Sequence, residues 1–154
     1  MFDYFVAALR CPRCGTVSPA TAVTNMQTHV RGGGADGSEL PVGAPLKPAY
    51  LKTQHLHGAG YALITQSPAE EPLRLLDVWT CPECDTEQWA LVEIFGNRIE
   101  RIEAVVMIRA TLDAANFISD ADAGLLAESL SGLSPSELAA RKLGTVEVLR
   151  QRLA

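Results

Sequence analysis

Two short stretches, Cys11-Pro12-Arg13-Cys14 and Cys81-Pro82-Glu83-Cys84, contain all four cysteines of this 154-residue chain. Each is a Cys-x-x-Cys that follows an apolar segment typical of a strand. Structural zinc binds four soft, deprotonated ligands in a tetrahedron, and two thiolates separated by two residues can hold one ion from a tight turn. Two such pairs with no cysteine left over predict a single metal ion, which we expect to be zinc. Its ligands are Cys11, Cys14, Cys81 and Cys84.

Three other interpretations of the cysteines are open. Two disulfides would require an oxidising compartment, but residues 1–10 lack the basic start and long apolar run of a secretory signal, so we expect a cytoplasmic protein. A thioredoxin-like redox site would account for one pair only, and the strand-then-helix context of such a site is absent. Iron is an alternative to zinc because tetrahedral sulfur sites hold either metal.

The motifs Cys-Pro-Arg-Cys-Gly (11–15) and Cys-Pro-Glu-Cys (81–84) resemble the knuckles of the zinc-ribbon superfamily, and they are also similar to the iron knuckles of rubredoxins. The resemblance covers these residues and the hairpin after the second pair. It implies a structural metal bound by the four cysteines. The sequence departs from the pattern in two ways: roughly 65 residues separate the knuckles, and Asp85 stands where a glycine would follow the second one. The second departure makes rubredoxin the weaker match.

Composition indicates one folded domain over residues 1–154. Hydrophobic residues make up 47% of the chain, enough for a core at this length. No apolar stretch has the length needed to cross a bilayer, so we expect no membrane association. The formal net charge is -5. Four thiolates and one Zn²⁺ would add two further negative charges.

The distribution of charge bears on the partner. Residues 1–80 contain six basic and six acidic side chains, whereas residues 81–154 contain seven basic and twelve acidic ones. Binding to nucleic acid depends on Lys and Arg that neutralise phosphates, and no basic run is present. We therefore expect a protein partner, one with a basic surface. The alternative is a nucleic-acid-associated zinc ribbon in transcription or its regulation, which would need five cations on one face: Arg10, Arg13, Arg31, Lys47 and Lys52.

The expected fold class is α+β, with an antiparallel sheet that carries the metal site and C-terminal helices packed on it. Residues 1–110 should be mostly β and residues 111–154 helical. Glycine and proline crowd residues 31–48, which predicts a mobile loop. The clearest strands are 86–95 and 98–109, joined by the two-residue turn Gly96-Asn97. The apolar run 105–108 is expected to be buried on both sides.

The last third contains helix-start signals. A short helical turn is expected over residues 111–118. Ser119 with Asp122 resembles a capping box, for a helix that ends near Gly132, and Ser134-Pro135 with Glu137 marks another start. Apolar residues then recur on one helical face, and residues 144–145 are a candidate break between two helices.

A second metal site is conceivable at His55 and His57. If residues 54–61 form a strand, the two imidazoles point to the same face, where His29 could add a third ligand. The simpler interpretation is that these side chains are polar and partly exposed.

The motifs of several enzyme classes are missing, among them His-Glu-x-x-His, Gly-x-Ser-x-Gly and the His-x-Glu of zinc deaminases. A catalytic zinc also needs an open coordination position, which four cysteines would fill. We expect a non-catalytic protein that acts by protein–protein interaction, as an adaptor, inhibitor or immunity-type partner.

Overall fold

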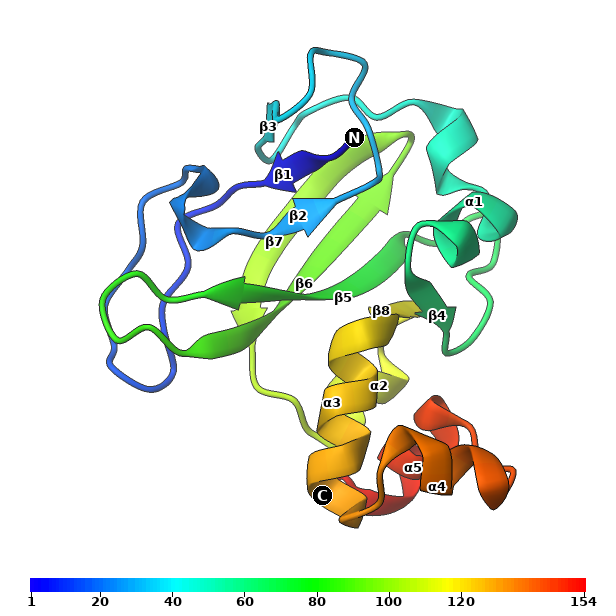
Figure 1. Cartoon of the computed structure of the whole chain (residues 1–154). Helices are drawn as coiled ribbons and strands as arrows, with labels where there is room; N and C mark the ends of the chain where they lie inside the picture. The colour runs from blue at the N-terminus through cyan, green and yellow to red at the C-terminus, as the bar shows by residue number, and fades with distance from the viewer.

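The structure is a computed structural model that describes residues 1–154, and it shows an α+β fold with two sheets (Figure 1). The strands are β1 (Asp3–Phe5), β2 (Gln27–Thr28), β3 (Glu39–Leu40), β4 (Tyr61–Leu63), β5 (Leu73–Thr80), β6 (Glu87–Phe95), β7 (Arg98–Val105) and β8 (Phe117–Ser119). The α-helices are α1 (Thr53–Gly58), α2 (Arg109–Asp113), α3 (Asp120–Ser131), α4 (Pro135–Ala140) and α5 (Thr145–Arg152), and the 3-10 helices are η1 (Ala22–Thr24) and η2 (Pro48–Leu51).

The larger sheet has five strands in the order β4-β8-β5-β6-β7. Strands β5, β6 and β7 form an antiparallel meander, as expected. Gly96 and Asn97 make the turn between β6 and β7 with φ of 57° and 58°, the left-handed values that a two-residue hairpin turn requires. Strand β8 pairs parallel to β5, so the sheet is mixed rather than purely antiparallel.

The smaller sheet has the order β2-β1-β3 and packs against one face of the larger sheet. β5 residues with odd numbers point toward it. Leu75 and Trp79 therefore share a core cluster with Phe5, Leu9 and Met26. This first core joins the N-terminal part of the chain to the large sheet.

The opposite face of the large sheet is covered by the C-terminal helices (Figure 1). Leu76 and Leu91 from the sheet pack there with Ala123, Leu138 and Leu149 from α3, α4 and α5. The expected packing of C-terminal helices on the sheet is confirmed. None of the helices has the length and apolar character needed to span a membrane.

The helix starts were predicted with mixed success. Ser134 and Glu137 form a full capping box on α4, with reciprocal hydrogen bonds of 3.2 Å. Ser119 instead donates its hydroxyl to the Asp122 carboxylate at 2.6 Å and caps no backbone amide. The end of α3 at Gly132 and the break before α5 are as expected.

Three expectations about secondary structure are wrong. The short helical turn expected over residues 111–118 forms as α2 but ends at Asp113, and residues 117–119 form β8 because their backbone pairs with β4 and β5. The run 105–108 is not buried on both sides, since Val106 and Ile108 are exposed beyond the end of β7. Residues 53–58 form the helix α1, not a strand.

The segment 31–48 is attached to the N-terminal sheet at several points. Its first residue, Arg31, is buried and forms an ion pair with the fully buried Asp3, with 3.1 Å between Nε and Oδ2. Asp3 also accepts hydrogen bonds from the amides of Gly32 and Ser38. Leu40 pairs in register with β1. These contacts give the glycine-rich segment a defined path around one buried carboxylate.

Candidate metal centre

The first knuckle is a tight turn between two short extended segments. The amide of Cys11 donates to the carbonyl of Thr16 at 3.0 Å, and the amide of Gly15 donates back to the carbonyl of Cys11 at 2.9 Å. An antiparallel bridge between Arg10 and Val17 closes the turn from outside. Gly15 has φ of 76°, a left-handed value that glycine adopts without strain.

The second knuckle repeats this pattern at the tip of the β5–β6 hairpin. The amide of Cys81 donates to Thr86 at 2.9 Å, and the amide of Asp85 donates to the carbonyl of Cys81 at 2.9 Å. Thr80 and Glu87 form the outer pair. Asp85 takes the place of glycine with φ of 55°, a conformation that aspartate tolerates better than most residues. The two Cys-Pro-x-Cys motifs therefore fold into equivalent turns.

The four sulfur atoms meet at one point, where each lies within 4.8 Å of the others. The shortest distances join the two knuckles: Cys11 Sγ to Cys84 Sγ is 3.7 Å and Cys14 Sγ to Cys81 Sγ is 3.6 Å. A disulfide would bring two sulfurs to about 2.05 Å. Four sulfurs placed at the Zn–S distance of about 2.3 Å in a tetrahedron are about 3.8 Å apart. The spacing thus fits four ligands around one ion.

Burial differs among the four thiols. Cys11 and Cys81 are buried, Cys84 is partly exposed and Cys14 is exposed. The hydroxyl of Thr86 lies 3.0 Å from the sulfur of Cys84. The centre is therefore anchored in the first core by one cysteine of each knuckle and reaches the surface through the other.

The environment favours thiolates at part of the site. Burial opposes ionisation of Cys11, but the amides of Cys14 and Arg13 donate to its sulfur and lower its pKa to about 6. The hydroxyl of Thr16 lowers the pKa of Cys14. The amide of Cys84 favours the Cys81 thiolate, yet burial and the neighbouring sulfurs outweigh it and raise the pKa of Cys81 to about 11. Without a cation the four thiols cannot all ionise together, so metal binding should release protons.

A metal at this point would link distant parts of the chain. Its ligand pairs are 73 and 67 residues apart in sequence, and they belong to the N-terminal lobe and to the β5–β6 hairpin. Four cysteine ligands fill a tetrahedron and leave no open position for substrate. Four cysteines are a ligand set that structural zinc sites use.

The histidines are not brought together in the way the strand prediction required. On α1, His55 and His57 are two positions apart, a spacing that does not place side chains on one face of a helix. The ring of His55 packs edge-on against Tyr50, with 4.4 Å between centroids. His29 is hydrogen-bonded through Nδ1 to the carbonyl of Met1 at 2.7 Å. His55 and His57 therefore do not form the same-face pair that a second metal site would need.

The cations required by the nucleic-acid alternative are partly engaged elsewhere. Arg31 is buried and pairs with Asp3 and with Asp36, the latter at 3.0 Å. Arg10 donates through Nη1 to the carbonyl of Gly15 at 2.8 Å. Arg31 cannot reach a phosphate without leaving the interior.

A buried polar chain joins the two sheets, and no sequence pattern pointed to it. Tyr61 on β4 donates its hydroxyl to the carboxylate of Asp77 on β5, and the hydroxyl of Thr28 on β2 lies 3.0 Å from that of Tyr61. Burial, with Asp122 adding its charge, raises the pKa of Asp77 to about 7. Burial and then Asp77 raise the pKa of Tyr61 well above its usual value.

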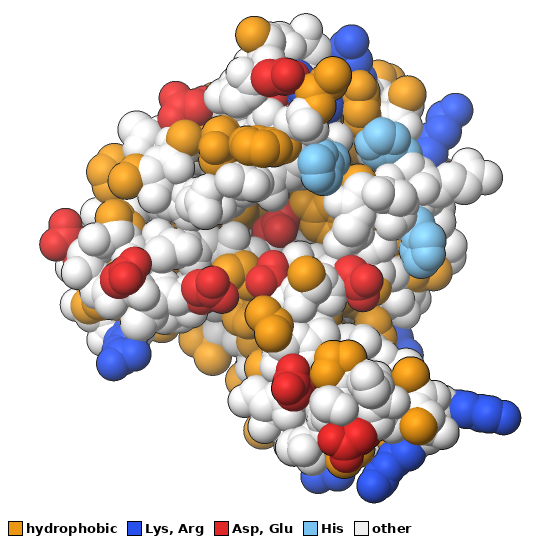
Figure 2. Space-filling view, in the orientation of Figure 1, with side chains coloured by type: hydrophobic (Ala, Val, Ile, Leu, Met, Phe, Trp, Pro, Cys, Tyr) orange, Lys and Arg blue, Asp and Glu red, His pale blue; other side chains and the backbone are white.

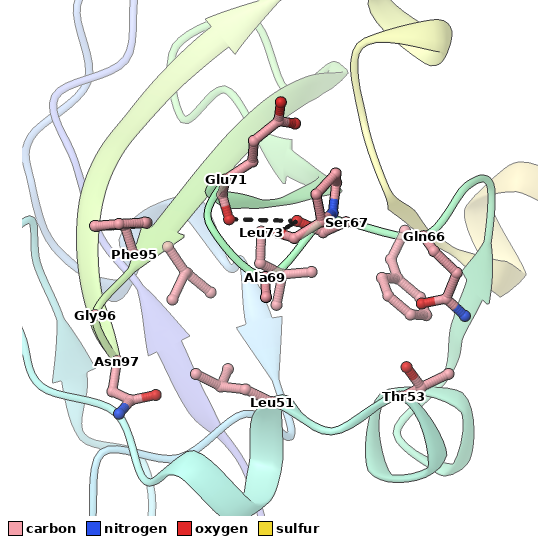
Figure 3. A pocket seen from close by; sticks show the side chains of 13 residues that line it. Leu51, Thr53, Gln66, Ser67, Ala69, Glu71, Leu73, Phe95, Gly96 and Asn97 are labelled. Atoms are coloured by element: carbon pink, nitrogen blue, oxygen red, sulfur yellow. Dashed lines mark hydrogen bonds between the residues drawn. The ribbon is translucent and has the colours of Figure 1, made fainter.

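A cavity of about 400 Å³ lies beside the β6–β7 turn (Figure 3). Leu51 and Thr53 line one side of it and Phe95 the other. A tight turn closes it, in which the hydroxyl of Ser67 donates to the carbonyl of Glu71 at 3.4 Å. The Glu71 carboxylate points away from the other lining side chains (Figure 3). Apolar and amide groups dominate the lining, and none of the four cysteines belongs to it.

Comparison with known proteins places the chain in no family: no family model matches it, and neither the curated proteins nor the solved structures contain a match.

Proposed function

We propose that the four cysteines bind one structural zinc ion and that the protein acts without catalysis, by binding another protein in the cytoplasm as an adaptor, inhibitor or immunity-type partner. The observation that carries the metal part is the convergence of four sulfurs at 3.6–3.7 Å across the two knuckles. Zinc is the proposed ion and iron the alternative, since both suit four thiolates. The equivalent hydrogen bonding of the two turns supports the likeness to zinc-ribbon knuckles.

The metal would contribute to folding rather than to chemistry. It would fix the N-terminal lobe to the tip of the β5–β6 hairpin, so that two knuckles distant in sequence are held together. Binding free energy of a structural zinc becomes folding free energy because the site does not exist in the unfolded chain. We therefore expect the metal-free protein to be much less stable than the loaded protein.

The charge of the surface supports a partner with a basic face. Residues 75–97 contain five acidic side chains and residues 110–140 another five, and neither segment contains a lysine or an arginine. Of these, Asp77 is buried and Glu93 is paired with Arg74 and Arg101, so the other carboxylates carry the surface charge. The first segment forms the hairpin that ends in the second knuckle, and the second includes α3. Complementary charge speeds encounter with a partner and disfavours wrong ones. Nucleic acid would be repelled by the same surface.

Native mass spectrometry of the protein purified from its own host tests both parts together. One zinc per chain with a co-purifying protein is the expected result. The metal part is contradicted by a metal-free mass, and the interaction part by tight binding to nucleic acid at physiological salt with no bound protein.

A further inference from the structure

An apolar groove lies between the β5–β6 hairpin and α3. Val78 and Trp89 are register partners in the two strands and face the helices, and Leu125 and Leu126 of α3 form the other wall. Leu125 is 62% exposed, so together with the neighbouring lining side chains it presents apolar surface to solvent. The backbone of Trp89 is fixed, because its carbonyl accepts a hydrogen bond from the indole of Trp79 at 3.1 Å.

The rim of this groove is acidic. Glu87 and Asp122 line it directly. The flanking elements add exposed carboxylates at Glu83, Asp85 and Asp120. On this face, Asp and Glu side chains run across the middle of the molecule, while Lys and Arg lie mostly at its margins (Figure 2).

The volume of the groove indicates what kind of ligand it can hold. Its volume is about 230 Å³. Pockets that enclose a drug-sized molecule or a cofactor measure about 300–1,000 Å³. A smaller, open groove lined in part by an aromatic ring suits an anchoring side chain of a protein partner, and Trp is among the residues that contribute most at such contacts.

We infer that this groove docks an amphipathic, Lys/Arg-rich segment of another protein, with a large apolar side chain against Trp89 and Leu125 and its basic residues beside Glu87 and Asp122. This inference rests on the proposed protein–protein function and names the surface that performs it. The apolar residues would supply most of the affinity. The carboxylates would orient the segment and make binding depend on salt.

A synthetic peptide tests the surface directly. The probe is an amphipathic helix of about 18 residues, with leucine on one face and lysine on the other and no tryptophan. Binding to the zinc-loaded protein is followed by the change in tryptophan fluorescence; Trp89 lines the groove, whereas Trp79 is fully buried and adds a constant background. A peptide with glutamate in place of lysine is the charge control.

Two pairs of variants locate the binding. Leu125→Gln and Glu87→Lys change the groove, while Val42→Gln and Glu70→Lys make a similar apolar-to-polar change and the same charge reversal at exposed positions elsewhere. Each groove variant should weaken binding by about tenfold, which is the effect of losing about 1.4 kcal/mol. The two matched variants should bind like the parent protein. Equal affinities for all four variants, or no binding of the lysine peptide, overturn the inference.

The same variants separate this inference from the proposed function. If a protein partner co-purifies and binds the parent and both groove variants equally, the interaction function stands and the groove is the wrong surface. If the lysine peptide binds in the groove but no protein partner exists, the surface is real and the proposed function is wrong.

Discussion

Replacing Cys14 with alanine separates metal binding from packing, because the side chain of Cys14 is exposed. An exposed substitution at an unimportant site changes the free energy of unfolding by no more than about 0.5 kcal/mol. A metal ligand at this position behaves differently. An ion bound by the four cysteines would link residues that are 67 and 73 positions apart. By analogy with a disulfide, releasing a closed loop of about 70 residues costs about 4 kcal/mol.

A loss of this size is a large fraction of the stability of a typical domain, about 5–15 kcal/mol. In a chain of this length it lowers the melting temperature by roughly 10 °C. The assay is thermal unfolding in reducing buffer, with and without a zinc chelator. Arg13→Ala is the matched control, since Arg13 is exposed in the same knuckle and its side chain is no ligand. The chelator should lower the melting temperature of the parent protein to that of Cys14→Ala, and it should leave the melting temperature of the variant almost unchanged.

Cys84→Ala provides a second check. Loss of either ligand dismantles the same site, so the double variant Cys14→Ala/Cys84→Ala should be little worse than either single variant. If Cys14→Ala melts like Arg13→Ala and the parent ignores the chelator, the cysteines do not share a metal and the reasoning is refuted.

Three further predictions concern the backbone and the buried carboxylates. Residues 15 and 85 both have left-handed backbone conformations, which glycine adopts without strain. Asp85→Gly should therefore leave the free energy of unfolding unchanged or raise it by about 0.5 kcal/mol, whereas Gly15→Ala should lower it by about 1 kcal/mol. Equal shifts of the melting temperature in the two variants would contradict this. Burial raises the pKa of Asp77 to about 7 from the ordinary 3.8, so the folded state binds the extra proton between these values and stability falls as pH rises through that window. Asp77→Asn removes the titrating group, so the stability of the variant should not fall in this way. The stability of the zinc-loaded variant relative to the zinc-loaded parent should therefore increase between about pH 5 and pH 8. A difference that stays constant with pH argues against the raised pKa. Asp3→Ala leaves the buried guanidinium of Arg31 without its main partner, and it should lower the free energy of unfolding in urea by about 3 kcal/mol. Asp36→Ala removes an exposed partner of the same arginine and should lower it by less than about 1 kcal/mol. The reverse order would be inconsistent with the burial of the Asp3–Arg31 pair.

The sequence predicts those parts of the fold whose causes are local. Each Cys-Pro-x-Cys dictates a turn within a few residues, and one ion that needs four ligands would require two such turns to meet. The turn Gly96-Asn97 and the capping box of Ser134 with Glu137 are equally local, and all of these form as expected.

Features that depend on distant pairing could not be predicted in this way. Strand β8 is three residues long and forms because its backbone pairs with β4 on one side and β5 on the other. The sequence of residues 117–119 contains no signal that predicts this pairing. Residues 53–58 have no clear period, so the sequence does not decide between a helix and the strand that would place His55 and His57 on one face. The hydrogen-bonded chain of Thr28, Tyr61 and Asp77 comes from three elements that meet only in the folded protein.

The groove shows the same limit. Trp89 belongs to a strand with an ordinary alternating pattern, and Leu125 belongs to a helix with an ordinary apolar content. Only the packing of α3 against β5 and β6 leaves both side chains accessible beside Glu87 and Asp122. The excess of acidic residues was visible in the sequence, but its concentration around an apolar groove was not.

The central claim is that the four cysteines bind one metal ion, and the native mass of the protein purified under reducing conditions tests it most directly. The account predicts one zinc ion per chain, lost together with the folded structure when a chelator is added. A metal-free chain that stays folded with four reduced thiols would contradict it. A chain lighter by one hydrogen for each cysteine would also contradict it, because the cysteines would then be joined in disulfides.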